Sequence, residues 1–417
     1  MLSTAARAYA RCWPALLAWF LAGWTARLLL LRLAAAVGNE LPLVGQLILP
    51  LAVIARLASY VAMFLVLRSA LPNIEDADPP RADGTRRGFL ARWAGAVSAA
   101  ILPFFVIYAA WGMIAEDSRD FAAAALDQTD FWGGGSANAL DVVVDVWSLG
   151  LVAAAFAGRW ALQRFRERLP RWTTAVSAYL EAVWVLVALL ILRELLAGVP
   201  GWLATRRMFA PVADAFARWR DEQTWFRWLG DAFSWLMEQL GDVVFQPLAW
   251  VALAAVVYAG ARTRATASAP NARVARARAA VTARWARLPR WARAGLTSVT
   301  GGFQERWLPI AGAIRLVWSA GPLALAGFLL AYAVVHAIGE WLAVGVLRVL
   351  GPHEFAFWTA VDDPIDLLVV ALVVPLQLAL VASAYDTALS RSPRAGSDAG
   401  HDVTAEGGTR AADAAGR

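Results

Sequence analysis

The sequence predicts an all-α, polytopic membrane protein, a bundle of about eight transmembrane helices with amphipathic surface helices. Of its 417 residues, 60% are hydrophobic and only 17% are charged, whereas soluble chains carry about a quarter charged residues. The mean hydropathy is +0.53. Apolar runs long enough to cross about 30 Å of hydrocarbon occur eight times. These observations predict an integral membrane bundle over residues 1–388.

The eight apolar runs are separated by polar or arginine-rich segments. Their limits are 13–36, 43–67, 93–115, 140–163, 172–197, 245–261, 318–343 and 365–388. Arg7 and Arg11 precede the first run, as basic residues precede the core of a secretory signal. That run is longer than a signal core and contains Arg27 and Arg32, so we expect a retained span.

Residues 200–244 read as an amphipathic segment outside the membrane. Apolar residues recur there at helical spacings of three and four, at Trp225, Leu229, Phe233, Leu236 and Leu240. A helix with one apolar face can lie flat on the outer leaflet or cap the bundle.

Two further segments are expected on the cytoplasmic side. The loop 262–306 holds ten Arg opposed only by Glu305, which predicts contact with anionic phospholipid headgroups through Arg273, Arg276, Arg284 and Arg287. This explanation requires no nucleic acid. Residues 389–417 lack apolar periodicity and are predicted to be a disordered cytoplasmic tail.

The arginine distribution predicts the threading of the chain. All 38 basic residues are Arg. With the N-terminus inside, the inner segments carry 23 of them and the outer loops seven. Because cytoplasmic loops collect positive charge, both termini are predicted to be cytoplasmic. The lysine-free composition, rich in Ala, Arg and Trp, suggests a bacterial genome of high G+C content and therefore a bacterial plasma membrane.

A two-helix hairpin recurs four times in the pattern. Each odd-numbered run opens with Arg followed by Trp, which interfacial preferences explain by themselves. Three even-numbered runs also hold Pro-Leu ten or eleven residues before a Tyr, at Tyr60, Tyr258 and Tyr385. Interfacial preferences do not explain that spacing. Duplication of a hairpin is our hypothesis, and repeats of this kind are common in transporter folds.

Ionisable groups inside the runs are the candidate functional residues, because each costs about 2.5–3.5 kcal/mol at a helix centre. They are Arg27, Arg32, Arg56, Asp141, Asp145, Glu181, His336, Glu340 and Asp366. One hypothesis is a polar cavity that opens outward, and the other is a set of static ion pairs that lock helix packing. Their similar depths in the membrane and their opposite charges predict Arg56 and Glu181 as partners across a central cavity, provided that their helices meet.

The sequence contains no motif for catalysis or cofactor binding. One cysteine, Cys12, and three scattered histidines predict no metal centre, and no phosphate loop, GxSxG or HExxH motif occurs. We therefore expect no cofactor and lean against an enzyme.

The favoured function is a transporter, flippase or exporter component with an intramembrane polar site. A scaffold of cell-envelope assembly with a membrane-protein partner is the alternative. A transferase for a lipid-linked substrate, using Asp362 or Asp363, comes third.

Reporter fusions test the threading. Fusions after Arg68, Asp127, Arg166 and Trp225 are expected to lie inside, outside, inside and outside in turn, and a fusion to the tail inside, because arginine-rich segments stay in the cytoplasm. Compartment-specific reporter activity measures each position. A tail reporter active outside the cytoplasm would contradict the threading.

Overall fold

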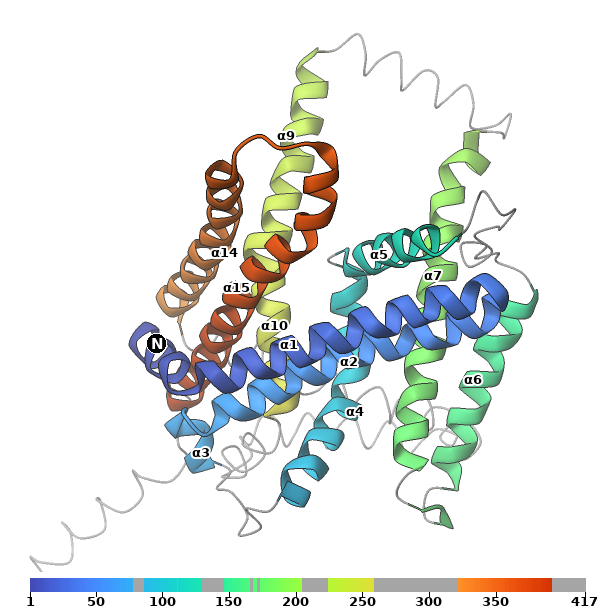
Figure 1. Ribbon diagram of the computed structural model, residues 1–417. Helices are drawn as coiled ribbons and strands as arrows, with labels where there is room; N and C mark the ends of the chain where they lie inside the picture. Colours follow the sequence, from blue (N-terminus) through green and yellow to red (C-terminus); the bar gives the residue numbers. More distant parts are fainter. Residues whose placement is uncertain are drawn as a thin grey trace, which may run out of the picture.

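The computed structural model describes residues 1–77, 86–110, 112–129, 146–165, 168–170, 173–204, 224–258 and 321–391, and these form helices and their connections (Figure 1). Within these ranges there is no β-strand, and six helices are long and apolar enough to cross a membrane. These helices fit a multi-pass membrane protein. The all-helical class is confirmed, whereas neither the count of eight spans nor the repeat is confirmed.

The described helices follow one another in this order along the chain. They are α1 (Leu2–Glu40), α2 (Pro42–Arg68), α3 (Pro72–Ala77), α4 (Arg86–Ala110), α5 (Met113–Asp127), α6 (Val146–Arg164), α7 (Thr173–Ala204), α9 (Thr224–Leu240), the π-helix η3 (Gly241–Phe245), α10 (Gln246–Val257), α14 (Pro322–Leu350) and α15 (Phe355–Arg391).

The six long apolar helices are α1, α2, α4, α7, α14 and α15. The predicted spans 140–163 and 245–261 fall on α6 and α10, which have 19 and 12 residues and are not among those six. Residues 140–145, the basic loop 262–306 and residues 392–417 lie outside the described part of the chain. The predicted tail begins too early, because α15 continues to Arg391 and buries Leu389.

Helices α1 and α2 form an antiparallel hairpin that runs obliquely to α4 and α7 (Figure 1). The turn between them is the single residue Leu41, whose N–H donates to the Val37 carbonyl oxygen at 2.7 Å. Pro42 then opens α2, where its missing N–H leaves no intrahelical bond unmade.

Small residues let the two helices of this hairpin approach closely. An ideal Cβ on Gly45 would lie 2.6 Å from the Gly38 Cα and 2.7 Å from the Ala34 carbonyl oxygen. Further along the hairpin, a Cβ on Gly23 would overlap the Ser59 side chain of α2. Close backbone approach through small residues is a general means of helix association in membranes.

The main core lies where α2, α4, α10 and α15 meet the N-terminal half of α1. Tyr258, directly after α10, donates from its hydroxyl to the Phe64 carbonyl oxygen at 2.6 Å and packs on Tyr385 of α15, with ring centroids 5.7 Å apart. Tyr60 of α2 packs edge-on against Trp250 at 5.2 Å. The three tyrosines of the sequence pattern are therefore buried in one core, while their origin by duplication remains a hypothesis.

Helix α4 ends five residues before the predicted limit of its run. After Ala110 the chain turns at Gly112, whose φ of +71° is in the left-handed region that glycine adopts without a Cβ penalty. Helix α5 then lies alongside the second half of α1 (Figure 1), where Phe121 and Ala125 pack with Leu31 and Ala34, and its start contacts α4. The sequence predicts an outer loop over residues 116–139, between the third and fourth runs. The first part of that stretch, up to Asp127, is instead helix α5, packed against the bundle.

Within the predicted amphipathic segment 200–244, residues Thr224–Leu240 form the helix α9, residues 200–204 belong to α7, and residues 205–223 lie outside the described part of the chain. Helix α9 continues through η3 into α10, so that three consecutive elements make one rod (Figure 1). Trp228, Phe233 and Trp235 on α9 are exposed. The predicted placement of this segment on the outer leaflet remains a prediction.

The close approach of α1 and α2 predicts a strict size limit at Gly45. We expect Gly45→Ala to lower the free energy of unfolding by about 1–3 kcal/mol, because the added methyl meets backbone atoms that cannot rotate away. An SDS titration of the purified protein measures this change. The control is Gly327→Ala in α14, where a Cβ meets nothing within 4 Å. Equal stability of the two variants would contradict the packing described.

Candidate functional site

Helix α5 places three carboxylates against the hairpin. Its buried positions Ile114, Asp117, Phe121 and Ala125 recur at helical spacing, so the face that packs on the bundle is apolar except for Asp117. Glu116 and Asp120 flank this face and are partly exposed, with 42% and 45% of their side chains accessible. The amphipathic pattern therefore carries one acid into the core and leaves two at its edge.

The acids of α5 meet two arginines buried near the middle of the hairpin. Arg27 of α1 and Arg56 of α2 are 2% and 7% exposed. Arg27 Nε donates to Asp117 Oδ1 at 2.8 Å, and its Nη2 donates to both Asp117 and Asp120. Arg56 Nη2 donates to Glu116 Oε1 at 2.7 Å. We call these five residues the α5 ion-pair network.

Asp117 is the centre of this network. Its Oδ1 accepts from Arg27 and lies 3.6 Å from Arg56 Nη1, while its Oδ2 accepts a hydrogen bond from the Tyr108 hydroxyl of α4. One carboxylate therefore joins α1, α2, α4 and α5. Arg27 is further stabilised by Trp24, whose ring centroid lies 5.4 Å from the guanidinium carbon.

One carboxylate oxygen each of Glu116, Asp117 and Asp120 lies within 4.8 Å of the others, a spacing that suits a hard divalent cation. Here the same carboxylates accept hydrogen bonds from Arg27 and Arg56. Two guanidinium groups in that space would repel a metal ion. The arrangement is that of an ion-pair network, and a cation could enter only after the arginines had moved.

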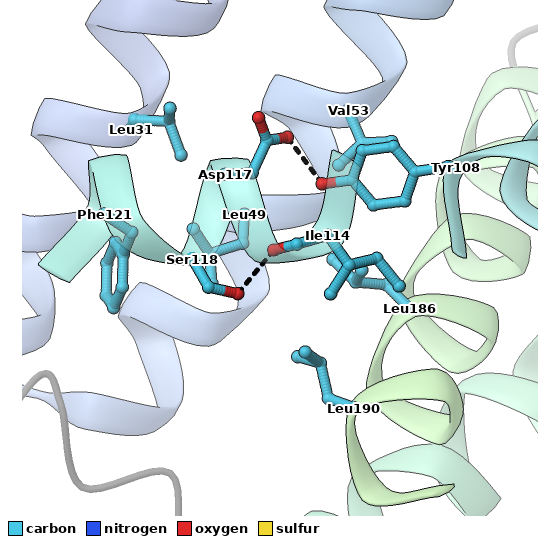
Figure 2. A pocket seen from close by; sticks show the side chains of 10 residues that line it. All are labelled: Leu31, Leu49, Val53, Tyr108, Ile114, Asp117, Ser118, Phe121, Leu186 and Leu190. Atoms are coloured by element: carbon cyan, nitrogen blue, oxygen red, sulfur yellow. Dashed lines mark hydrogen bonds between the residues drawn. The ribbon is translucent and has the colours of Figure 1, made fainter. Parts of the chain in front are cut away.

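A cavity of about 210 Å³ lies beside the network (Figure 2). It is bordered by the hairpin, the end of α4, helix α5 and helix α7. Its lining is Leu31, Leu49, Val53, Tyr108, Ile114, Asp117, Ser118, Phe121, Leu186 and Leu190. We call it the α5 cavity. Asp117 belongs to both the network and the cavity wall.

The structure brings together only some of the candidates predicted from the sequence. Arg27 and Arg56 join the network, whereas Asp366 of α15 is exposed and makes no ion pair with it among the described residues. Arg32 of α1 and the pair His336 and Glu340 of α14 are exposed. Asp141, Asp145 and the four lipid-contact arginines lie outside the described residues.

The predicted partnership of Arg56 with Glu181 is not the pairing in the structure. Arg56 pairs with Glu116, whereas Glu181 of α7 lies 3.4 Å from Arg159 Nε of α6. Depth and sign alone could not identify the neighbouring helix. Arg159 lies near the inner end of the fourth run, 140–163, and the arginine count assigned it to the cytoplasmic side and not to an intramembrane pair.

Glu116, Asp117, Asp120 and Tyr108 are the residues that sequence reasoning missed. Three of them lay in, and Tyr108 just before, the stretch treated as an outer loop. The signal was present, because acids alternate with Ile114 and Phe121 at helical spacing directly after an apolar run.

Comparison with models of known protein families, with curated proteins and with solved structures finds no match to this chain. Its function is therefore argued from the site alone.

The geometry predicts unequal roles for two acids of the network. We expect Asp117→Asn to lower the free energy of unfolding by about 3–5 kcal/mol, because it leaves two buried guanidinium groups without their shared counter-charge. Asp120→Asn, at a half-exposed position, should change it by about 1 kcal/mol or less. Unfolding in SDS compares the two variants. A larger loss for Asp120→Asn would contradict the central place of Asp117.

Proposed function

We propose that the protein is a membrane transporter whose path runs along the α5 cavity and is closed by the α5 ion-pair network. The observation that carries this proposal is a charged network between two buried arginines and a short helix, directly beside a cavity that the same helix lines. Intramembrane ionisable groups commonly mark substrate or ion pathways.

The exposure of two of its acids suits a contact between α5 and the hairpin that can open and close. Arg27 and Arg56 are buried, but Glu116 and Asp120 are partly exposed and accessible to competing partners. An exchange of partners would keep the guanidinium groups paired, which burial requires.

Other parts of the expected function remain proposals of the same kind. We propose a bacterial plasma membrane location with both termini in the cytoplasm, on the arginine distribution. Contact of the basic loop with anionic phospholipids is proposed on its composition.

A membrane scaffold is the second candidate, and one observation favours it. Helix α9 exposes Trp228, Phe233 and Trp235 on a segment that extends from α10, a composition suited to a partner protein or a membrane surface. The transferase hypothesis has weaker support, because Asp362 and Asp363 are exposed on α15 and belong to neither the α5 ion-pair network nor the α5 cavity.

Cysteine accessibility distinguishes a transporter from a scaffold. In a Cys12→Ala background, Ser118→Cys places one thiol in the wall of the α5 cavity. We expect a charged thiol reagent to reach it from one side of oriented vesicles, and Glu116→Gln to raise the reaction rate from the opposite side. If the substitution lowers the free energy that favours the closed state by about one or two kcal/mol, the reaction rate rises by roughly 5–30-fold.

The matched control is Arg119→Gln, on the same helix. Among the described residues, the Arg119 side chain donates to the Ala115 carbonyl oxygen of its own helix and takes no part in the α5 ion-pair network. It should leave both rates unchanged. Accessibility that stays one-sided in Glu116→Gln, with the variant folded by size-exclusion chromatography, would contradict the transporter and favour the scaffold.

A further inference from the structure

The size of the α5 cavity restricts what it can hold. Its volume of about 210 Å³ exceeds that of an apolar cavity of about 150 Å³ that binds benzene, and it is smaller than the pockets of about 300–1,000 Å³ that hold drug-sized ligands. A ligand here would be a small molecule or the end of a chain.

Most of the cavity wall is apolar. Ile114 and Phe121 face it from α5, and Leu186 and Leu190 face it from α7, as Figure 2 shows. The hairpin adds three more aliphatic side chains. A wall of this kind favours an aliphatic body, since each methylene that leaves water adds to binding.

The polar part of the wall can accept hydrogen bonds but has no hydrogen left to donate. The Tyr108 hydroxyl donates to Asp117, and the Ser118 hydroxyl donates to the Ile114 carbonyl oxygen at 2.6 Å (Figure 2). The Asp117 carboxylate has only lone pairs. A ligand that reaches these atoms must therefore bring its own donor.

The charge of Asp117 is already compensated by Arg27 and Arg56. A cationic head would be repelled by these guanidinium groups and would lose its hydration in an apolar cavity. An anionic head would face a wall of acceptors. A neutral hydroxyl avoids both penalties.

We infer that the α5 cavity binds a small aliphatic molecule with a terminal hydroxyl group. The hydroxyl donates to the acceptors of Asp117 or Ser118, and the aliphatic body lies between α5 and α7. As a statement about the transported substrate this rests on the proposed function, but as a binding site it does not.

Photolabelling with a diazirine-bearing octanol tests this site in the full-length protein reconstituted in lipid. We expect label within residues 114–121 and 186–190, located by mass spectrometry and reduced by excess octan-1-ol. Leu190→Trp fills the cavity and should lower this labelling by about tenfold or more, because each loss of about 1.4 kcal/mol in binding free energy lowers the affinity tenfold. The control Leu195→Trp, at an exposed position of the same helix, should retain it.

Ser118→Leu is a second filling variant at an exposed position, so it tests the site if Leu190→Trp fails to fold. The inference is overturned if labelling persists in the folded filling variants or spreads evenly over the exposed apolar helices. Equal or stronger labelling by the corresponding octylamine or octanoate probe would also overturn it. If no labelling is seen but Glu116→Gln makes the Ser118→Cys thiol accessible from both sides, the binding site is wrong and the transporter proposal stands. If labelling is specific but the thiol stays accessible from one side only, the binding site stands and the transporter proposal is wrong.

Discussion

Two guanidinium groups lie close together in the middle of the α1–α2 hairpin, and the rest of the site depends on how their charge is balanced. Arg27 and Arg56 are buried and repel each other, and each has lost most of its hydration. An uncompensated charge at such a position costs several kcal/mol. Helix α5 supplies the counter-charge, with Asp117 between the two arginines and Glu116 and Asp120 beside them.

The position of α5 follows from this requirement together with the local backbone. Gly112 turns the chain back from α4, and the apolar spacing of Ile114 and Phe121 directs Asp117 inward. With α5 held there, a space remains between it and α7, bordered by the Asp117 carboxylate. The ion-pair network and the cavity are therefore two consequences of one docked helix. A transporter that opened this cavity would have to release the arginines, which is why network and path are linked in the proposed mechanism.

Hydropathy and periodicity predicted the helical membrane class, because lipid requires long apolar segments with internally satisfied backbones. They also predicted the limits of α2 closely and those of α7 and α14 approximately, whereas α1 and α15 begin well before the predicted runs, at Leu2 and Phe355. They misread α5, since a short helix with three acids looks like a polar loop to a window of transmembrane length. Arg27 and Arg56 were identified as intramembrane charges by their cost. Their partners could not be identified, because single-sequence depth says nothing about which helices are neighbours. Glu181 matched Arg56 in depth and sign, yet it pairs with Arg159 on α6.

A double-mutant cycle tests most directly whether α5 neutralises the buried arginines of the hairpin. Free energies of unfolding are measured for Arg56→Gln, Glu116→Gln and the double variant, and in parallel for Arg56→Gln with Glu181→Gln. Residues in contact show coupling of about 0.5–3 kcal/mol, while separated ones add within about 0.3–0.5 kcal/mol. The 2.7 Å contact predicts coupling for Arg56 with Glu116 and additivity for Arg56 with Glu181. Additivity of the first pair, or coupling of the second in its place, would contradict the account.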